Sequence, residues 1–205
     1  MMLLSDYVRF YGDILSDELC DEVINFYENN LDLEFGASVG GSEKVKLEER
    51  NSKIVPIPAS ASIDSVLCDA VTKTIMLYID SVTQSFINGG SDSDFVRCFP
   101  KEFTSDTFLI NKYSQGEYYK WHCDQSFNPN QGSMFSRVFS ILFYLNDDFE
   151  GGETKFLFGE IKPKKGACLV FPSNFIYPHY SLSVTKGVKY SLATWLSPRI
   201  NTDGV

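Results

Sequence analysis

Seven short runs of β-forming residues, separated by turn residues, occupy the chain between residues 107 and 196. They are rich in β-branched and aromatic side chains and cover residues 107–113, 118–123, 138–145, 154–158, 168–171, 176–181 and 189–196. Gly, Asn, Ser and Pro lie between them, as expected for turns. Short strands at this spacing are typical of sandwiches and barrels rather than of alternating βαβ units. The second half of the chain is therefore predicted to be a β core.

The first half of the chain has helical periodicity. Apolar residues share one stripe from Ser16 to about residue 30, and Ser16 followed by two acids is typical of a helix N-terminus. A longer helix is expected from about 62 to 86, ended by the Gly- and Ser-rich residues 88–93. The charged residues 36–53 indicate a loop or a weak edge strand.

Composition limits the class of protein. The chain has 205 residues, 43% of them apolar, which is enough for a core. No linker or internal repeat divides it, so we expect one α+β domain over residues 1–205, with a helical support region at 1–95 and a β core at 96–200. No apolar run approaches the roughly 20 residues needed to cross a bilayer, so no membrane association is expected.

Charge and cysteine content concern partners and compartment. A net charge of −9 disfavours nucleic-acid binding, which needs a basic surface. The five cysteines include no C-x-x-C pair and are interpreted as reduced thiols, mostly in the core. The N-terminus lacks the features of a secretory signal, so the expected compartment is the cytoplasm. Nothing in the sequence indicates an oligomeric state.

The chain has only two histidines, and both lie in the β half. In His122-Cys123-Asp124 the imidazole and the carboxylate would share one face of an extended strand, with Cys123 on the other face. His179 follows 57 residues after His122. If the sheet curls, these side chains form the two-His, one-carboxylate set of non-haem Fe(II) oxygenases. A catalytic zinc site and two structural histidines stay open as alternatives.

Four segments around these residues form an ordered pattern. Residues 109–124 lead an aromatic strand into H-x-D, residues 145–154 contain an acidic turn and Gly-Gly-Glu-Thr, residues 163–172 form a Gly-containing strand entry, and Lys189 lies ten residues after His179. This order resembles the Fe(II)- and 2-oxoglutarate-dependent dioxygenases, most closely their prolyl 4-hydroxylase-like branch. The resemblance implies a double-stranded β-helix, or jelly roll, with N-terminal helices packed on it.

The resemblance also implies a role for each residue of the pattern. It assigns three residues to Fe(II): His122, Asp124 and His179. Lys189 would pair with the distal carboxylate of 2-oxoglutarate, Tyr113 would assist it, and Thr154 would line the same pocket. Ordinary interior roles stay open for Tyr113 and Thr154. The carboxylate of Asp124 implies hydroxylation rather than halogenation, with O2 consumed, succinate and CO2 released, and ascorbate as an expected stimulant.

The substrate is less constrained. Residues 125–136 resemble a short version of the loop that covers the cleft in prolyl hydroxylases, and Arg137 after it could contact substrate or solvent. We expect a prolyl residue of a peptide or protein as substrate, with a free amino acid or small metabolite as the alternative. A non-catalytic jelly-roll binding module is a different class, and the retention of His122, Asp124, His179 and Lys189 together argues against it.

Overall fold

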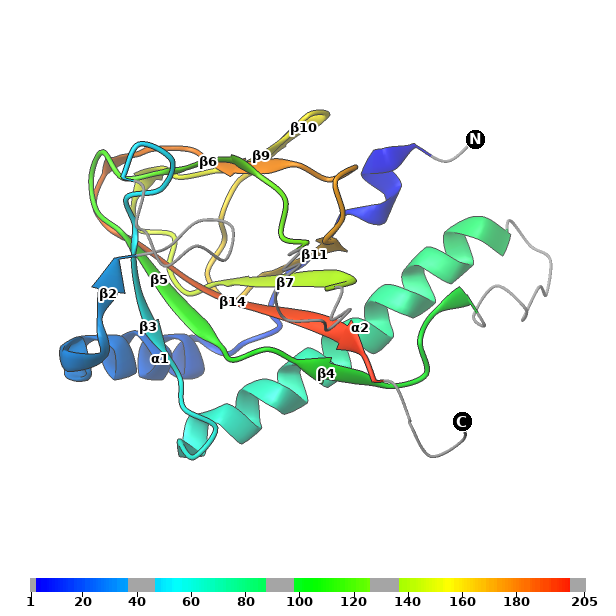
Figure 1. Ribbon diagram of the computed structural model, residues 1–205, viewed down its shortest axis with the longest axis horizontal. Helices are drawn as coiled ribbons and strands as arrows, with labels where there is room; N and C mark the ends of the chain where they lie inside the picture. Colours follow the sequence, from blue (N-terminus) through cyan, green and yellow to red (C-terminus); the bar gives the residue numbers. More distant parts are fainter. Residues whose placement is uncertain (1–2, 37–46, 88–97, 126–136, 200–205) are drawn as a thin grey trace, which may run out of the picture.

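Two facing β-sheets and two helices form the molecule (Figure 1). The computed structural model describes residues 3–36, 47–87, 98–125 and 137–199. The larger sheet has the strand order β1-β11-β7-β14-β5-β3-β2, with β4 paired to β14. Its strands are β1 (Arg9–Tyr11), β2 (Phe35–Gly36), β3 (Lys53–Pro56), β4 (Phe103–Ser105), β5 (Leu109–Tyr113), β7 (Phe139–Tyr144), β11 (Cys168–Pro172) and β14 (Lys189–Pro198).

The smaller sheet faces the larger one and has the order β10-β9-β12-β6. Its strands are β6 (Tyr119–His122), β9 (Thr154–Phe156), β10 (Gly159–Ile161) and β12 (His179–Ser181), and a separate pair joins β8 (Glu150–Gly151) to β13 (Val184–Lys186). Every pairing is antiparallel. This is the double-stranded β-helix that the sequence predicts.

The helices lie on the side of the larger sheet that faces away from the smaller one (Figure 1). They are α1 (Asp17–Asn29) and α2 (Ser62–Ile87), with short 3-10 turns at Leu4–Tyr7 and Leu31–Leu33. Ser16 caps α1, because its hydroxyl accepts a hydrogen bond from the Leu19 backbone N–H at 3.2 Å. Both predicted helices are confirmed.

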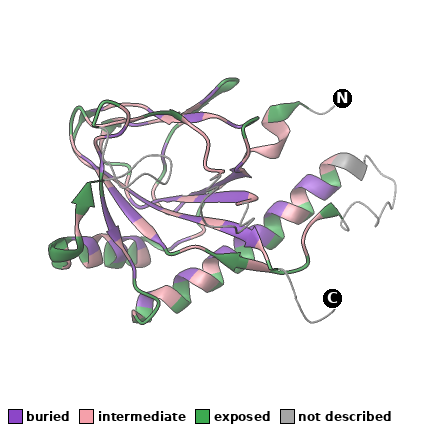
Figure 2. Ribbon diagram, viewed as in Figure 1, coloured by how far each residue is buried: buried purple, intermediate pink, exposed green. Residues whose placement is uncertain are grey.

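The main core fills the space between the helices and the larger sheet. Val23 and Tyr27 of α1 and Leu67 of α2 are fully buried there against Phe143 and Leu192. Figure 2 shows this as buried faces on both helices and along the strands of the larger sheet. The strands alternate, so the opposite face of the larger sheet is free to line the space between the two sheets.

All seven predicted strands are present, but the support region is not purely helical. β1 pairs with β11 and β3 pairs with β5, so residues before 95 complete the larger sheet. These strands are only three and four residues long, and β3 ends in a proline, so they carry no alternating pattern of their own. The expected helix end at 88–93 and residues 126–136 of the expected loop lie outside the described residues.

Two further expectations concern the cysteines and the membrane. All five cysteines are free thiols, as predicted, but only Cys20 and Cys168 are buried, so the expectation that most lie in the core is wrong. No helix in the described parts of the chain is both long enough and apolar enough to cross a membrane.

Candidate active site

His122, Asp124 and His179 meet between the two sheets. β6 and β12 are neighbours, and their register sets His122 opposite His179 with ring centroids 4.1 Å apart. Asp124 follows the end of β6, and its two carboxylate oxygens each lie 3.6 Å from one imidazole Nε2. One ligand atom from each of the three side chains lies within 4.8 Å of the others. The curl of the sheet thus brings together residues that are 57 positions apart.

Backbone carbonyls fix which nitrogen of each ring faces Asp124. His122 Nδ1 lies 2.7 Å from the Lys120 carbonyl oxygen, and His179 Nδ1 lies 3.2 Å from that of Tyr177. A carbonyl only accepts hydrogen bonds, so each Nδ1 donates its proton and each Nε2 keeps its lone pair. Two such nitrogens and one carboxylate form the donor set of a three-ligand metal face, so these residues fit a divalent metal such as Fe(II).

Hydrogen bonds and charge prepare Asp124 for this role. The Ser140 hydroxyl donates to Asp124 Oδ2 at 2.6 Å and also lies 2.9 Å from the buried Ser173 hydroxyl. Burial alone would raise the pKa of Asp124, but the two histidines, when protonated, and the Ser140 hydrogen bond outweigh it and lower the pKa. Burial and the neighbouring His179 lower the pKa of His122, which favours the neutral imidazole that a metal requires.

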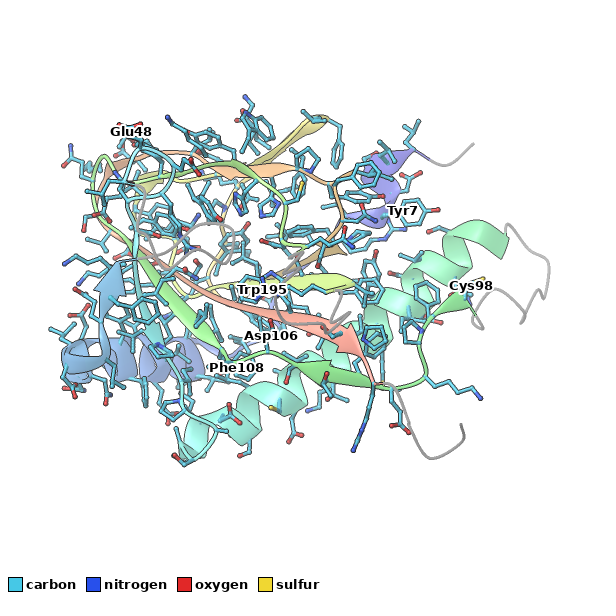
Figure 3. The ribbon with its side chains drawn as sticks, in the orientation of Figure 1. Tyr7, Glu48, Cys98, Asp106, Phe108 and Trp195 are labelled. Atoms are coloured by element: carbon cyan, nitrogen blue, oxygen red, sulfur yellow. The ribbon has the colours of Figure 1, made fainter. Side chains whose placement is uncertain are left out.

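Arg137 supports the segment that carries Asp124. Its Nη1 donates to the Asp124 carbonyl oxygen at 3.2 Å, its Nη2 pairs with Asp106 at 2.8 Å, and its guanidinium lies 3.8 Å from the ring centroid of Trp195. Figure 3 shows Asp106 and Trp195 close together near the middle of the molecule. The structure thus places Arg137 beside the site.

Lys189 lies in the same pocket, which has a cavity volume of about 60 Å³ and is also lined by Tyr113 and Thr154. The side chain of Lys189 is 1% exposed, and its Nζ donates to the Gly152 carbonyl oxygen at 2.6 Å and the Ser181 hydroxyl at 3.0 Å. Burial lowers the pKa of Lys189 to about 7, although the negative charge of Glu153 acts to raise it. These contacts are to neutral groups, so a buried ammonium fits a carboxylate of a bound molecule.

The two aromatic neighbours complete this end of the pocket. The Lys189 Nζ lies 5.1 Å from the ring centroid of Tyr113 and 5.7 Å from that of Tyr144. The hydroxyl of Thr154 forms a hydrogen bond with the hydroxyl of Tyr144, and the two oxygens are 2.7 Å apart. Thr154 is thus a pocket residue whose hydroxyl already has a partner.

Several pocket residues were not singled out from the sequence. They are Arg50, Asn111, Ser140 and Ser181. The signal for Ser140 is a polar residue in an otherwise apolar strand, whereas Asn111 stands beside Lys112 in β5 and is less distinct. Arg50 carries no such signal, because it stands in a run of charged residues.

Comparison with known proteins agrees with this site. The model of the 2OG-Fe(II) oxygenase superfamily matches residues 108–197. The chain is 43% identical over 70 residues to prolyl 3-hydroxylase 2 of Homo sapiens, and this match covers 30% of this chain and 10% of that protein. It is 34% identical over 119 residues to probable prolyl 4-hydroxylase 9 of Arabidopsis thaliana, which covers 44% of this chain and 40% of that protein. The chain therefore spans less than half the length of these curated relatives.

The similarity in fold to a solved structure covers nearly the whole chain. The solved structure of the viral collagen prolyl hydroxylase from Paramecium Bursaria Chlorella virus-1 superimposes with a TM-score of 0.65 at 23% identity, covering 94% of this chain and 97% of that one. At this identity the superposition shows a shared fold. Over residues 108–197 the chain matches the 2OG-Fe(II) oxygenase superfamily, and prolyl hydroxylases are among the proteins that it is similar to.

Proposed function

We propose that this chain is an Fe(II)- and 2-oxoglutarate-dependent dioxygenase that hydroxylates a prolyl residue of a peptide or protein. The observation that carries the proposal is that the metal-type donor set and the buried Lys189 line one pocket. The prolyl hydroxylases among the relatives support the prolyl substrate. When bound, iron and 2-oxoglutarate supply the oxidation, in which O2 places one oxygen atom in succinate and one in the product as CO2 leaves.

The chain's own residues divide the remaining work. The group that we assign to Fe(II) is His122, Asp124 and His179. Lys189 holds the distal carboxylate of 2-oxoglutarate by charge in a site closed to water, where an ion pair is strong. The Tyr113 ring and the Thr154 side chain line the site of this carboxylate. Because the donor set and Lys189 are fixed by separate hydrogen bonds, they hold the two ends of the co-substrate independently.

Three finer points belong to the same proposal. We propose that residues 1–205 act as one domain, supported by the pairing of β1 and β3 with strands of the second half. The five free thiols support a reducing compartment, the cytoplasm. We expect ascorbate to stimulate turnover.

The test is anaerobic reconstitution with Fe(II) followed by 2-oxoglutarate. We expect a visible metal-to-ligand absorption band, succinate formation once O2 is admitted, and a product heavier by one oxygen atom among proline-containing peptides. Asp124→Ala is the matched control and should give neither band nor succinate. A wild-type protein that forms no band and no succinate would contradict the proposal.

A further inference from the structure

Arg50 places a second buried cation against the pocket. Its side chain is 9% exposed, although it follows the exposed Glu48 by only two residues, and Figure 3 shows Glu48 at the edge of the molecule. A β-bridge joins Arg50 to Tyr119, the first residue of the strand β6, which also carries His122. The chain therefore turns inward at this point and brings the guanidinium to the site.

Neutral groups hold the guanidinium in place. Its Nε donates to the Ser52 hydroxyl at 2.9 Å, and its Nη2 donates to the Asn111 side-chain oxygen. Its Cζ lies 4.4 Å from the ring centroid of Tyr119. Within the part of the chain that the structure describes, no carboxylate forms an ion pair with Arg50. Since arginine keeps its charge at any physiological pH, this is a buried charge that lacks a counter-ion there.

The charges that line the pocket also indicate that Arg50 needs an anion as its partner. Arg50, Asp124 and Lys189 are its formally charged residues among those described. The charge of Fe(II) cancels that of the 2-oxoglutarate dianion, and the ammonium of Lys189 cancels the carboxylate of Asp124. The positive charge of Arg50 remains after metal and co-substrate have bound, so a further anion would complete the site.

The position of Arg50 relates this anion to the reaction. The Tyr119 ring stacks on the His122 ring, with centroids 3.4 Å apart and an angle of 11° between the planes. One aromatic ring therefore separates Arg50 from a residue that we assign to the metal. A group bound by Arg50 lies in the same pocket as the donor set, and the substrate must bring its reacting carbon into this pocket.

We propose that Arg50 binds a carboxylate of the substrate through a charge-assisted hydrogen bond. The inference rests on the proposed function and narrows its substrate to a prolyl group with a carboxylate close to the reacting carbon. That carboxylate has two sources: the α-carboxylate of a free amino acid or chain end, and an acidic side chain next to the target proline. Arg50 thereby determines specificity.

The test compares matched acid and amide ligands in the anaerobic complex of the protein with Fe(II) and 2-oxoglutarate. Binding is followed by the change of the visible absorption band, which needs no turnover. The pairs are L-proline with L-prolinamide, Gly-Pro with Gly-Pro amide, and acetyl-Pro-Asp amide with acetyl-Pro-Asn amide. We expect the acid of at least one pair to bind about tenfold or more tightly than its amide, as for a hydrogen bond to a charged group.

Variants attribute this preference to Arg50. Arg50→Gln should bring the ratio of the two dissociation constants to about one while the amide binds as before, and Arg50→Lys should retain part of the preference. Arg199→Gln, which removes an exposed arginine elsewhere, should keep the wild-type ratio. The pair that shows the preference identifies the source of the carboxylate.

The outcomes separate the two proposals. If the band forms with 2-oxoglutarate but wild-type protein binds acid and amide equally, or binds no acid at millimolar concentration, the role of Arg50 is wrong and the proposed function stands. A preference that survives in Arg50→Gln overturns the role as well. If the band never forms, the proposed function fails and this inference fails with it.

Discussion

Lys189 is the residue whose charge depends most on what the pocket contains. Burial lowers its pKa to about 7, so near neutral pH a large part of it is uncharged when no anion is bound beside it. A carboxylate bound against its Nζ favours the ammonium form and raises that pKa again. Binding of 2-oxoglutarate is therefore coupled to proton uptake at this residue.

The coupling predicts a pH dependence of co-substrate affinity. Below pH 7 Lys189 is already charged, and the dissociation constant of 2-oxoglutarate should be flat. Above pH 7 each binding event takes up a proton, so the dissociation constant should rise by up to about tenfold per pH unit. Anaerobic titrations of the iron-loaded protein between pH 6 and 9 measure this. Lys189→Arg should show no such rise, and an equal rise in both proteins would contradict the assignment.

Metal binding and co-substrate binding should be separable by single substitutions. Asp124→Ala removes a proposed ligand, so its metal affinity should fall by more than the roughly 10- to 100-fold typical of groups behind the ligands. Lys189→Ala should keep its metal but need much more 2-oxoglutarate. Metal content after dialysis and the 2-oxoglutarate dissociation constant measure the two effects. Loss of metal in Lys189→Ala would show that the two ends of the site are not independent.

Site residues could be identified from the sequence where the spacing between them was characteristic. The H-x-D pair and the ten-residue spacing from His179 to Lys189 are short distances along the chain, which the sequence shows directly. Arg50 could not be found this way, because a run of charged residues reads as solvent-exposed and only its pairing with Tyr119 buries it. Ser140 reads as a core strand residue until Asp124 is placed opposite it.

At the scale of elements, the turn between β8 and β9 is built around Lys189. Gly151 and Gly152 have φ angles of 76° and 70°, a region that favours glycine. A Cβ on Gly152 would lie 3.1 Å from Cδ of Lys189, and a Cβ on Gly151 would lie 2.4 Å from the Ser183 carbonyl oxygen. The Gly-Gly pair therefore lets the backbone approach the lysine closely enough for the Gly152 carbonyl to accept its hydrogen bond.

Gly152→Ala should weaken 2-oxoglutarate binding severalfold, because the new Cβ displaces the Lys189 side chain. Gly116→Ala is the matched control: its φ is 86°, but a Cβ there meets no atom within 4 Å. Both variants should lose about 1 kcal/mol of unfolding free energy to backbone strain. Chemical denaturation and anaerobic titration measure the two effects. An unchanged dissociation constant in Gly152→Ala would refute the steric argument.

The elements that could be predicted are those whose sequence carries its own pattern. Apart from β6, the predicted strands alternate or bury residues on both faces, and α1 and α2 have a stripe of apolar residues. The strands β1, β3, β8, β10 and β13 have two to four residues each and form because a neighbouring strand or turn offers them partners. Such strands are set by tertiary structure, which local sequence does not record.

At the scale of the whole molecule, pocket side chains join the two sheets. Ser140 of β7 bonds to Asp124, Tyr144 of β7 bonds to Thr154 of β9, and Lys189 of β14 bonds to Ser181 of β12. Each bond runs from a strand of the larger sheet to the smaller sheet or, at Asp124, to the segment that follows β6. The sheets are therefore held together partly by the residues that would bind metal and co-substrate.

Loading the site should consequently stabilise the smaller sheet. A ligand at 100 times its dissociation constant adds about 2.7 kcal/mol to the free energy of unfolding. With a divalent metal and 2-oxoglutarate, hydrogen exchange should slow in β6, β9 and β12 more than in α1. Asp124→Ala should show neither the slower exchange nor the added stability. Uniform protection over helices and sheets would mean that the ligands act on global unfolding alone.

The three bonds between the sheets also limit how this pocket can change. A substitution at Ser140, Thr154 or Ser181 that reshapes the pocket for a different molecule removes a bond that joins the barrel. New specificity gained at these three positions therefore costs stability, and the same holds for Arg50, which contacts Tyr119 of β6 and Asn111 of β5. Variation in substrate preference among chains with this architecture should accordingly concentrate at pocket positions whose side chains join no such pair of strands.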